Sequence, residues 1–291
     1  MSTEHKTYLR FSIPQRIEHF ILILTFTTLG LTGLAQKYSL WPISQDFIAA
    51  LGGIEATRII HRTAAIIFAL ESVYHVIILA YKLFVLRVEA TMLPGIKDGK
   101  DVIDFVMYNL RLSKKQPKMP RYNFAEKMEY WAMIWGTVLM GLTGFMLWNP
   151  IGVANVLPGQ FIPAAKAAHG AEAVLAVLAI LIWHFYNVHI KHFSKAMFTG
   201  KMTHHEMEEE HGEELEKIQA GKAVYTPPDR ATYRKRMTFF VPAAVVFVGL
   251  SLAALYFVTL REESALATYP PAVATSDVYV LPTATPSGPS N

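Results

Sequence analysis

Four histidines lie inside long apolar segments of this 291-residue chain, where packing alone does not require them. His61 and His75 share one segment at a spacing of i to i+14, and His169 and His184 share another at a spacing of i to i+15. In an α-helix these spacings correspond to a rise of about 21–22 Å and bring the second side chain to within roughly 40–60° of the first. Each segment therefore presents two imidazoles on one face at two depths. A polar group inside a membrane is a functional candidate by default.

Two imidazoles that face each other across a helical bundle are typical axial ligands of a six-coordinate b-type haem. If the two segments run parallel, His61 meets His169 at one depth and His75 meets His184 at the other, which predicts two haems. Six-coordination leaves no position for oxygen, so the expected chemistry is electron transfer. A non-redox membrane transporter or assembly subunit that uses the histidines for protons is the alternative.

Composition narrows the remaining possibilities. The chain has no cysteine, which excludes disulfides, cysteine-bound zinc, iron–sulfur clusters and covalently attached haem. Only 17% of its residues are charged, against an average of about 25%. The charges gather in a few segments, as in a polytopic membrane protein, and the net charge of +4 reflects basic loops and predicts no nucleic-acid partner.

Five apolar segments are long enough to cross the hydrocarbon layer, which takes about 20 helical residues. We expect an all-α membrane protein with a four-helix haem-binding bundle and a fifth transmembrane helix. The predicted spans are 17–35, 57–86, 125–148, 164–190 and 238–260. The predicted domains are a dihaem bundle at 1–200, a charged cytoplasmic linker at 201–236, the fifth helix at 237–261 and a disordered extracytoplasmic tail at 262–291.

The distribution of lysine and arginine orients the spans. Basic residues are dense in the N-terminal segment, in the connection between the second and third spans, and in the run Arg234–Arg236. The positive-inside rule places all three in the cytoplasm, so the C-terminus is extracytoplasmic. No cleaved signal peptide is expected. Residues 101–112 read as a short amphipathic helix on the cytoplasmic surface.

An internal repeat relates the first and third spans. The segment 16–20 (RIEHF) matches 127–131 (KMEYW), and 30–34 (GLTGL) matches 141–145 (GLTGF) at the same offset along the chain. The histidine pairs on the second and fourth spans extend the match. We therefore expect a duplicated helical hairpin, with the fifth helix outside the repeat.

Small and basic residues near the histidines are expected to receive the haems. Glycine lets a flat macrocycle approach the backbone, and basic side chains pair with its propionates. The glycines are Gly30, Gly33, Gly141 and Gly144; the expected propionate partners are Arg58, Arg62 and Lys166 for the outer haem and Arg16, Lys82 and Lys127 for the inner one. At the inner surface Glu18, His19, Glu129 and Tyr130 are candidates for binding or protonating a quinone, and Glu71 is either a proton-transfer group or the partner of a basic residue.

Three further histidines lie in a charged segment at 202–222. His205 and His211 are six residues apart, which turns them about 240° from each other on a helix and disfavours a shared metal site. We expect this segment, His204 included, to be a solvated linker or helix.

The motifs RxxHF at 16–20 and RIIHR at 58–62, with the histidines of 164–190, resemble the cytochrome b membrane subunits of respiratory formate dehydrogenases and nickel–iron hydrogenases. The resemblance covers roughly residues 8–200. It implies a dihaem cytochrome b of the bacterial inner membrane. Such a subunit exchanges electrons between menaquinone or ubiquinone and a periplasmic iron–sulfur or multihaem subunit.

The resemblance and the spacing disagree about one haem. The resemblance implies His61 with His169 for the outer haem and His19 with His184 for the inner one. This chain adds His75, as in the cytochrome b of bc-type complexes, and its spacing of 15 exceeds the 14 usual in the family. Because Tyr130 stands at the repeat position of His19, the spacing argument favours His75 with His184. His19 is then left for the quinone, a propionate or a third haem.

Overall fold

The computed structural model describes residues 6–115, 117–191, 193–222 and 225–260. Within them, five helical segments are long and apolar enough to cross a membrane. They are Ile13–Lys37, Ile54–Leu86, Phe124–Trp148, Phe161–Lys191 and Arg230–Thr259. The prediction of an all-α membrane protein with a fifth transmembrane helix is confirmed. The predicted tail at 262–291 lies outside the described residues.

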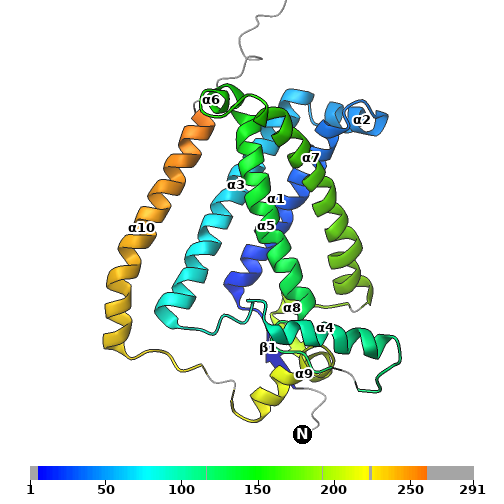
Figure 1. Ribbon diagram of the computed structural model, residues 1–291, viewed down its shortest axis with the longest axis vertical. Coiled ribbons are helices and arrows are strands. Elements are labelled where there is room, and N and C mark those ends of the chain that lie inside the picture. Colours follow the sequence, from blue (N-terminus) through cyan, green and yellow to red (C-terminus); the bar gives the residue numbers. More distant parts are fainter. Residues whose placement is uncertain (1–5, 116, 192, 223–224, 261–291) are drawn as a thin grey trace, which may run out of the picture.

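The first four spans form two antiparallel hairpins that pack together (Figure 1). Helix α1 (Ile13–Lys37) packs along α3 (Ile54–Ala80), α5 (Phe124–Trp148) packs along α7 (Phe161–Ala179), and α1 also contacts α7. Short helices α2 (Pro42–Ala50) and α6 (Pro150–Ala154) join the helices of each hairpin at what we call the hairpin end.

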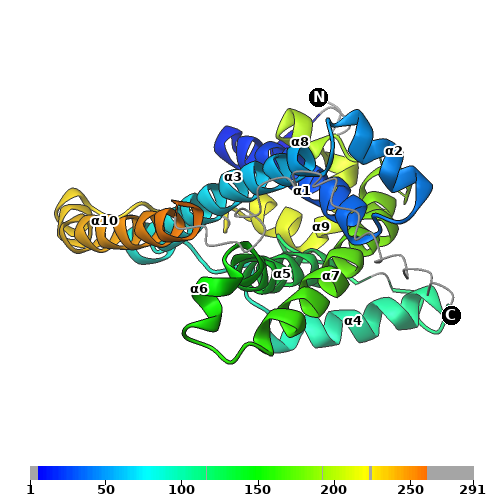
Figure 2. The same ribbon diagram turned by 90° about the horizontal axis from the view of Figure 1, so that it is seen from above.

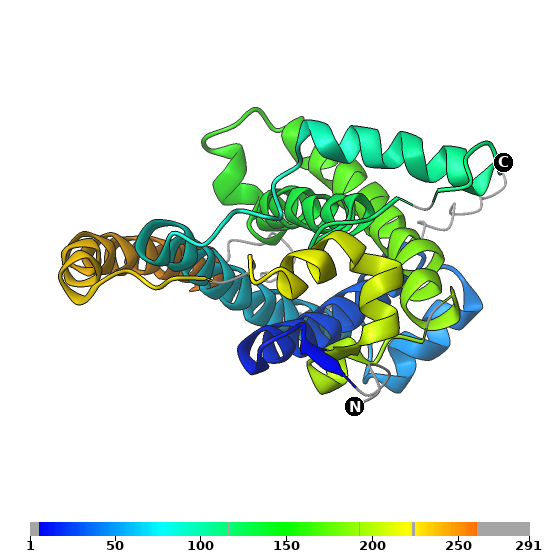
Figure 3. The same cartoon turned by 90° about the horizontal axis from the view of Figure 1, so that it is seen from below.

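The opposite end, here the capped end, carries the other short elements (Figure 3). They are α4 (Ile96–Asn109), α8 (Ala196–Thr199), α9 (His204–Gln219) and the strands β1 (Thr7–Leu9) and β2 (Lys201–Thr203). Helix α4 overlaps the amphipathic helix predicted at 101–112. It directs Asp98 and Asp101 inward, whereas its apolar Ile103 and Val106 are exposed.

Local sequence explains where α5 begins and ends. Its N-cap is Asn123, whose side chain accepts a hydrogen bond from the Glu126 N–H at 2.9 Å, while the Glu126 carboxylate accepts one from the Asn123 N–H at 2.8 Å. This capping box satisfies two backbone donors that a helix start leaves open. The helix ends at Trp148, as predicted, because Pro150 cannot continue it and instead begins α6.

Two transmembrane helices continue in wider π-helical turns. Helix α3 passes into η2 (Tyr81–Leu86), and α7 passes into η3 (Ile180–His184) and η4 (Tyr186–Lys191). The interval from His61 to His75 lies wholly in α-helix, whereas the interval from His169 to His184 includes η3. A π turn accommodates an extra residue in one turn, so it absorbs the additional residue of the longer interval. The π turn therefore accounts for the additional residue between His169 and His184.

The fifth transmembrane helix, α10 (Arg230–Leu260), lies at the side of the bundle beside α3 (Figure 2). It begins earlier than predicted, because the Asp229 carboxylate accepts hydrogen bonds from the N–H groups of Ala231 and Thr232. The basic run Arg234–Arg236 consequently lies inside the helix. At the capped end the Arg236 guanidinium donates to the Val85 carbonyl at 2.8 Å, which fastens α10 to η2.

The charged segment at 202–222 is a folded part of the capped end. Strands β1 and β2 pair antiparallel, with Tyr8 opposite Met202. Helix α9 buries Met207 and Leu215 in the same cluster as Tyr8 and Met202. The expectation of a solvated segment is therefore wrong for the inner face of α9.

His211 is the clearest departure from that expectation, because only 1% of it is exposed. Its Nδ1–H donates to the Pro120 carbonyl at 2.9 Å. Burial lowers the pKa of His211, the nearby Arg10 guanidinium lowers it further, and the Glu126 carboxylate opposes both. The imidazole is therefore neutral in the folded protein near pH 7.

The burial of His211 predicts that the stability of α9 at the capped end depends on pH. The pKa of His211 is lower in the folded state than the unfolded value of about 6.5, so its contribution to stability is fully present above that pH and is lost as the pH falls below it. We expect proteolysis within α9 to increase between pH 7.5 and 5.5, as measured by limited proteolysis and mass spectrometry. His211→Asn, which keeps a side-chain donor but does not titrate, should flatten this dependence. His205→Asn, at a side chain that is 78% exposed, is the matched control, and equal pH profiles for His211→Asn and the wild type would contradict the prediction.

Candidate functional site

One histidine pair lies toward the hairpin end. The rings of His61 on α3 and His169 on α7 face each other with their centroids 6.5 Å apart. The Thr32 hydroxyl lies 2.9 Å from His61 Nδ1, and the Thr143 hydroxyl lies 2.9 Å from His169 Nδ1. Each hydroxyl also lies within hydrogen-bonding distance of a carbonyl one turn back in its own helix. Because a hydroxyl has one hydrogen and gives it to that carbonyl, it accepts from Nδ1–H, which leaves the Nε2 lone pair of each imidazole available.

Two of the predicted glycines allow these imidazoles to lie against the neighbouring helices. A Cβ at Gly33 would stand 3.2 Å from His61 Cε1, and one at Gly144 would stand 3.1 Å from His169 Cε1. A Cβ at Gly30 would instead meet a methyl group of α7, and one at Gly141 would meet nothing within 4 Å. Gly33 and Gly144 thus position the histidines themselves.

A second pair lies toward the capped end. The ring of His184 faces that of His19 on α1, with their centroids 6.3 Å apart. The Glu129 carboxylate accepts a hydrogen bond from His184 Nδ1–H at 2.8 Å. A metal-binding imidazole commonly donates its second N–H to a carboxylate, which orients the ring and makes Nε2 more basic. His184 therefore has the environment of a ligand.

His75 does not face His184, contrary to the expectation from spacing. Its Nδ1 lies 2.9 Å from Glu18 Oε2, and its Nε2 lies 3.1 Å from the Tyr130 hydroxyl. The expectation assumed that α3 and α7 run parallel. Figure 1 shows that they converge at the hairpin end and diverge toward the capped end. Helix α1 contacts both, so a histidine on α1 reaches His184 where one on α3 does not.

The internal repeat is visible in these contacts. Thr32 and Thr143 make the same hydrogen bond, Gly33 and Gly144 make the same close approach, and Glu18 and Glu129 each accept from a histidine. Each of these pairs is related by the offset that relates the segment 16–20 to 127–131. The halves differ at one position, where His19 in the first hairpin corresponds to Tyr130 in the second. The duplicated scaffold therefore holds two histidine pairs and one histidine–tyrosine pair.

The basic residues predicted to bind propionates have varied partners. The Lys127 ammonium contacts both carboxylate oxygens of Asp98, at 2.8 and 2.9 Å. Burial opposes ionisation of that carboxylate, but its hydrogen bonds from Lys127 and the Gly95 N–H outweigh burial, so the pKa of Asp98 is lowered. Arg16 donates to the carbonyls of Met197 and Phe198. Lys127 therefore connects α5 to α4, and Arg16 connects α1 to α8, at the capped end.

The remaining cations lie nearer the ends of the bundle. Arg58 pairs with Glu55 on its own helix at 2.8 Å, and Arg62 lies over the Trp148 ring at 4.9 Å. Lys166 is exposed and Lys82 is half-buried. Of these four predicted cations, Arg62 is the one that contacts an aromatic ring in the described residues.

Sequence reasoning missed three residues at the site. The Trp148 indole Nε1 is buried without a hydrogen-bond partner among the described residues, although an unpaired buried donor is costly. The Lys37 ammonium would lie 2.7 Å from a Cβ at Gly170, next to His169 in sequence. Glu172, which lies within the span of α7, places its carboxylate against Gly136 of α5. Charges within apolar spans or at their ends are the sequence signal that could have identified Lys37 and Glu172.

Comparison with known proteins agrees with this geometry. Residues 10–200 match the family described as prokaryotic cytochrome b561. The chain belongs to the prokaryotic cytochrome b561 family. It is 23% identical, over 76% of its length and 97% of the relative's, to the cytochrome b556(Fdn) subunit of the nitrate-inducible formate dehydrogenase of Escherichia coli K12. It is also 23% identical, over 68% of its length and 86% of the relative's, to the formate dehydrogenase cytochrome b556(fdo) subunit of the same strain.

Membership makes the chain a multi-pass cytochrome b of a bacterial inner membrane, with b-type haem as its cofactor. The histidine pairs fit such a group. Two imidazoles bound to one metal need about 4 Å between their coordinating nitrogens, because each metal–nitrogen bond is about 2.0–2.1 Å. Ring centroids 6.5 Å and 6.3 Å apart leave room for that separation. The 3.1 Å between His75 and Tyr130 is too short, because a metal between them requires about 4 Å.

The glycine contacts predict an effect on haem binding. Gly144→Val places methyl groups where His169 lies, so we expect less haem per chain in the purified protein, as measured by the pyridine haemochrome assay. Gly249→Val on α10 is the matched control, because Gly249 has open space beside it and lies outside the four helices that carry the histidine pairs, and it should keep the wild-type haem content. Equal haem content in the two variants would contradict the positioning role of Gly144.

Proposed function

We propose that this chain is a dihaem membrane subunit of a respiratory oxidoreductase. It carries electrons across the bilayer between the quinone pool and an extracytoplasmic redox subunit. The observation that carries the proposal is the presence of two histidine pairs at two depths of one bundle, each with the separation that a shared iron requires.

The proposed ligands are His61 with His169 and His19 with His184. Three of these four imidazoles have Nδ1 engaged by a threonine or glutamate of a neighbouring helix, which directs Nε2 toward the metal. Bis-histidine b-type haem supplies one-electron redox chemistry without binding oxygen. His75 is left out because both of its ring nitrogens have partners within the protein.

Polar groups near the hairpin end are suited to hold haem propionates. The Trp148 N–H has no acceptor among the described residues, and the Arg62 guanidinium lies over the same indole. Lys37 adds a cation beside Gly170. A carboxylate near them would accept the indole hydrogen bond and be neutralised.

The electron path follows from the proposed orientation. Lysine and arginine are dense at the capped end, which favours a cytoplasmic position for that end and for the N-terminus, and an extracytoplasmic C-terminus. The His61–His169 haem then lies near the extracytoplasmic partner. The chain has no cysteine and hence no iron–sulfur cluster of its own, so the partner supplies the next redox centre, an iron–sulfur cluster or a multihaem cytochrome. Relatives named as formate dehydrogenase subunits support such an assembly.

Menaquinone or ubiquinone is the proposed partner at the capped end. A quinone exchanges two electrons and two protons, so its site needs a haem and proton-carrying side chains together. Glu18 and Tyr130 meet at His75 on this side, and Glu129 lies beside His184.

Single histidine variants distinguish the ligand sets. We expect His19→Ala and His184→Ala each to lose about one of two haems, because each removes an axial ligand. His75→Ala, the control at a similar depth, should retain both. The measurements are haem content and the reduced-minus-oxidised spectrum of the purified protein. Loss of a haem in His75→Ala with retention in His19→Ala would reverse the assignment. A wild-type protein without a b-type spectrum would refute the redox function and favour a proton-relay protein.

A further inference from the structure

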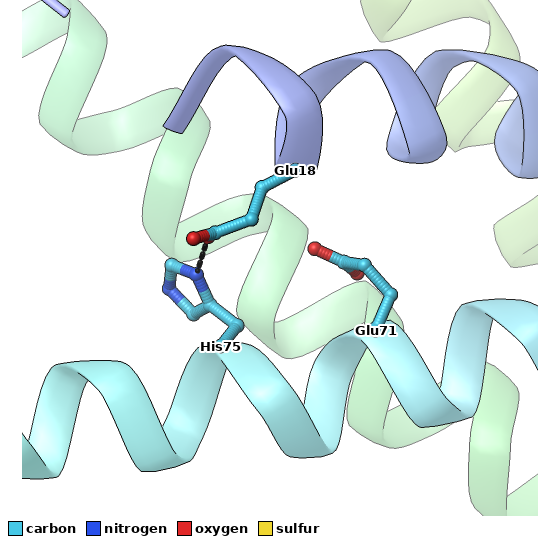
Figure 4. A group of neighbouring side chains, drawn as sticks. All are labelled: Glu18, Glu71 and His75. Atoms are coloured by element: carbon cyan, nitrogen blue, oxygen red, sulfur yellow. Dashed lines mark hydrogen bonds and ion pairs between the residues drawn. The ribbon is translucent and has the colours of Figure 1, made fainter. Parts of the chain in front are cut away.

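A cluster of four polar side chains lies at the capped end between α1, α3 and α5. His75 donates from Nδ1–H to Glu18 at 2.9 Å and accepts at Nε2 from the Tyr130 O–H at 3.1 Å. One carboxylate oxygen of Glu71 lies within 4.8 Å of the Glu18 and His75 atoms (Figure 4). These three side chains are half-buried, and the Glu71 carboxylate forms no hydrogen bond or ion pair with any described residue.

An apolar groove lies between α1 and α3 on the hairpin-end side of this cluster. Its volume is about 300 Å³, and Thr25, Thr28, Ile60, Ala64 and Ile67 are among the residues that line it. Residues 60, 64, 67 and 71 recur every three or four positions, so Glu71 continues the stripe of α3 that lines the groove. Glu18 and Thr25 are seven residues apart on α1 and likewise share a face. The groove and the cluster are therefore neighbouring parts of one surface.

The described residues of the second hairpin do not repeat this combination. At the offset along the chain that relates His61 to His169, Glu71 corresponds to Ala179. Around His184, Glu129 takes the place that Glu18 has beside His75. His19 takes the place that Tyr130 has in the cluster. The scaffold therefore builds a histidine pair without a second carboxylate, and Glu71 and Tyr130 are what distinguish the first hairpin.

We propose that this cluster and groove form the quinone site, with the ring at Glu71, His75 and Tyr130 and the isoprenoid tail in the groove. The inference rests on the proposed function and names the residues of its quinone site. A polar pocket that opens into an apolar groove fits a ligand with a polar head and a long apolar tail. A metal ion is a poorer fit, because it would have to displace a hydrogen-bond partner from His75.

The proton balance gives each group a role. Reduction of a quinone adds two electrons and two protons and forms two O–H bonds; the electrons come singly from a b-type haem, whose iron changes from ferrous to ferric each time. Oxidation of a quinol is the reverse. Glu71, without a hydrogen-bond partner among the described residues, exchanges a proton with the ring oxygen, and His75 exchanges protons with the cytoplasmic side.

Photoaffinity labelling tests the location. The probe is an azido-quinone with a saturated ten-carbon tail, applied to membranes containing the full chain and its partners. We expect labelled peptides from α1 and α3, and Ile67→Trp, which fills the groove, should reduce labelling by about tenfold or more. Leu175→Trp is the matched control, because Leu175 occupies the repeat position of Ile67 on α7 and is 62% exposed to the surroundings of the bundle. It should leave both labelling and haem content unchanged.

Labelling confined to α5 and α7, or unchanged labelling in Ile67→Trp, would overturn the inference. The proposed function would still stand if the wild-type haems were reduced by a quinol. No haem reduction by any quinol in the wild type would instead overturn the proposed function itself.

The Glu71→Gln variant tests the chemistry separately. The amide keeps the size of the side chain but does not exchange a proton, so labelling by the azido-quinone should persist. We expect the rate of haem reduction by decylubiquinol, measured by stopped-flow absorbance, to fall about a hundredfold, the scale of one acid–base group. Reduction by dithionite, which needs no quinone site, should be unchanged. A wild-type rate with decylubiquinol in Glu71→Gln would exclude Glu71 as the proton-exchanging group.

Discussion

The hydrogen bond at Nδ1 of His61, His75, His169 and His184 is the interaction on which the site depends. An imidazole in an apolar layer has two possible neutral tautomers, and only a partner at one nitrogen determines which lone pair remains. Thr32 and Thr143 do this at one end of the bundle, and Glu18 and Glu129 do it at the other. In each of these four cases the histidine lies on the second helix of a hairpin and its partner lies on the first. The hairpin is thus the unit that orients an imidazole, because α1 packs along α3 and α5 packs along α7.

Duplication of that unit produces an architecture with unequal halves. The Glu129–His184 pair is completed by His19, whereas the Glu18–His75 pair is completed by Tyr130. The ring centroids of His19 and His184 are 6.3 Å apart, which leaves space for a metal. The hydrogen bond of 3.1 Å between His75 and Tyr130 leaves no such space. Replacing one aromatic side chain by another therefore changes a position that fits a metal into a hydrogen-bonded polar cluster. The apolar groove beside that cluster and the additional carboxylate of Glu71 occur on the same hairpin.

The capped end shows how a charged segment can support a membrane bundle. Asp98 on α4 pairs with Lys127 at the start of α5, Arg10 pairs with Glu126, and Lys97 bridges Asp101 and Glu213. These ion pairs join the N-terminal segment, α4, α5 and α9, which are far apart in the sequence. Of the cations predicted from sequence to meet propionates at this end, Lys127 belongs to this network and Arg16 instead donates to carbonyls of α8. They hold the ends of the spans in register.

The sequence by itself determined the membrane class, the five spans, the repeat, the end of α5 at Trp148 and the candidate histidines. These features follow from local hydropathy, proline chemistry and spacing along a single helix. Only the tertiary structure decided which histidines face each other. The ring opposite His184 depends on the angle between α3 and α7, and the longer histidine spacing on α7 depends on the π turn of η3; neither is encoded in an α-helical period. The burial of His211 and the meeting of Glu71 with Glu18 were likewise decided by contacts between segments far apart in the chain, for which charge and periodicity carry no signal.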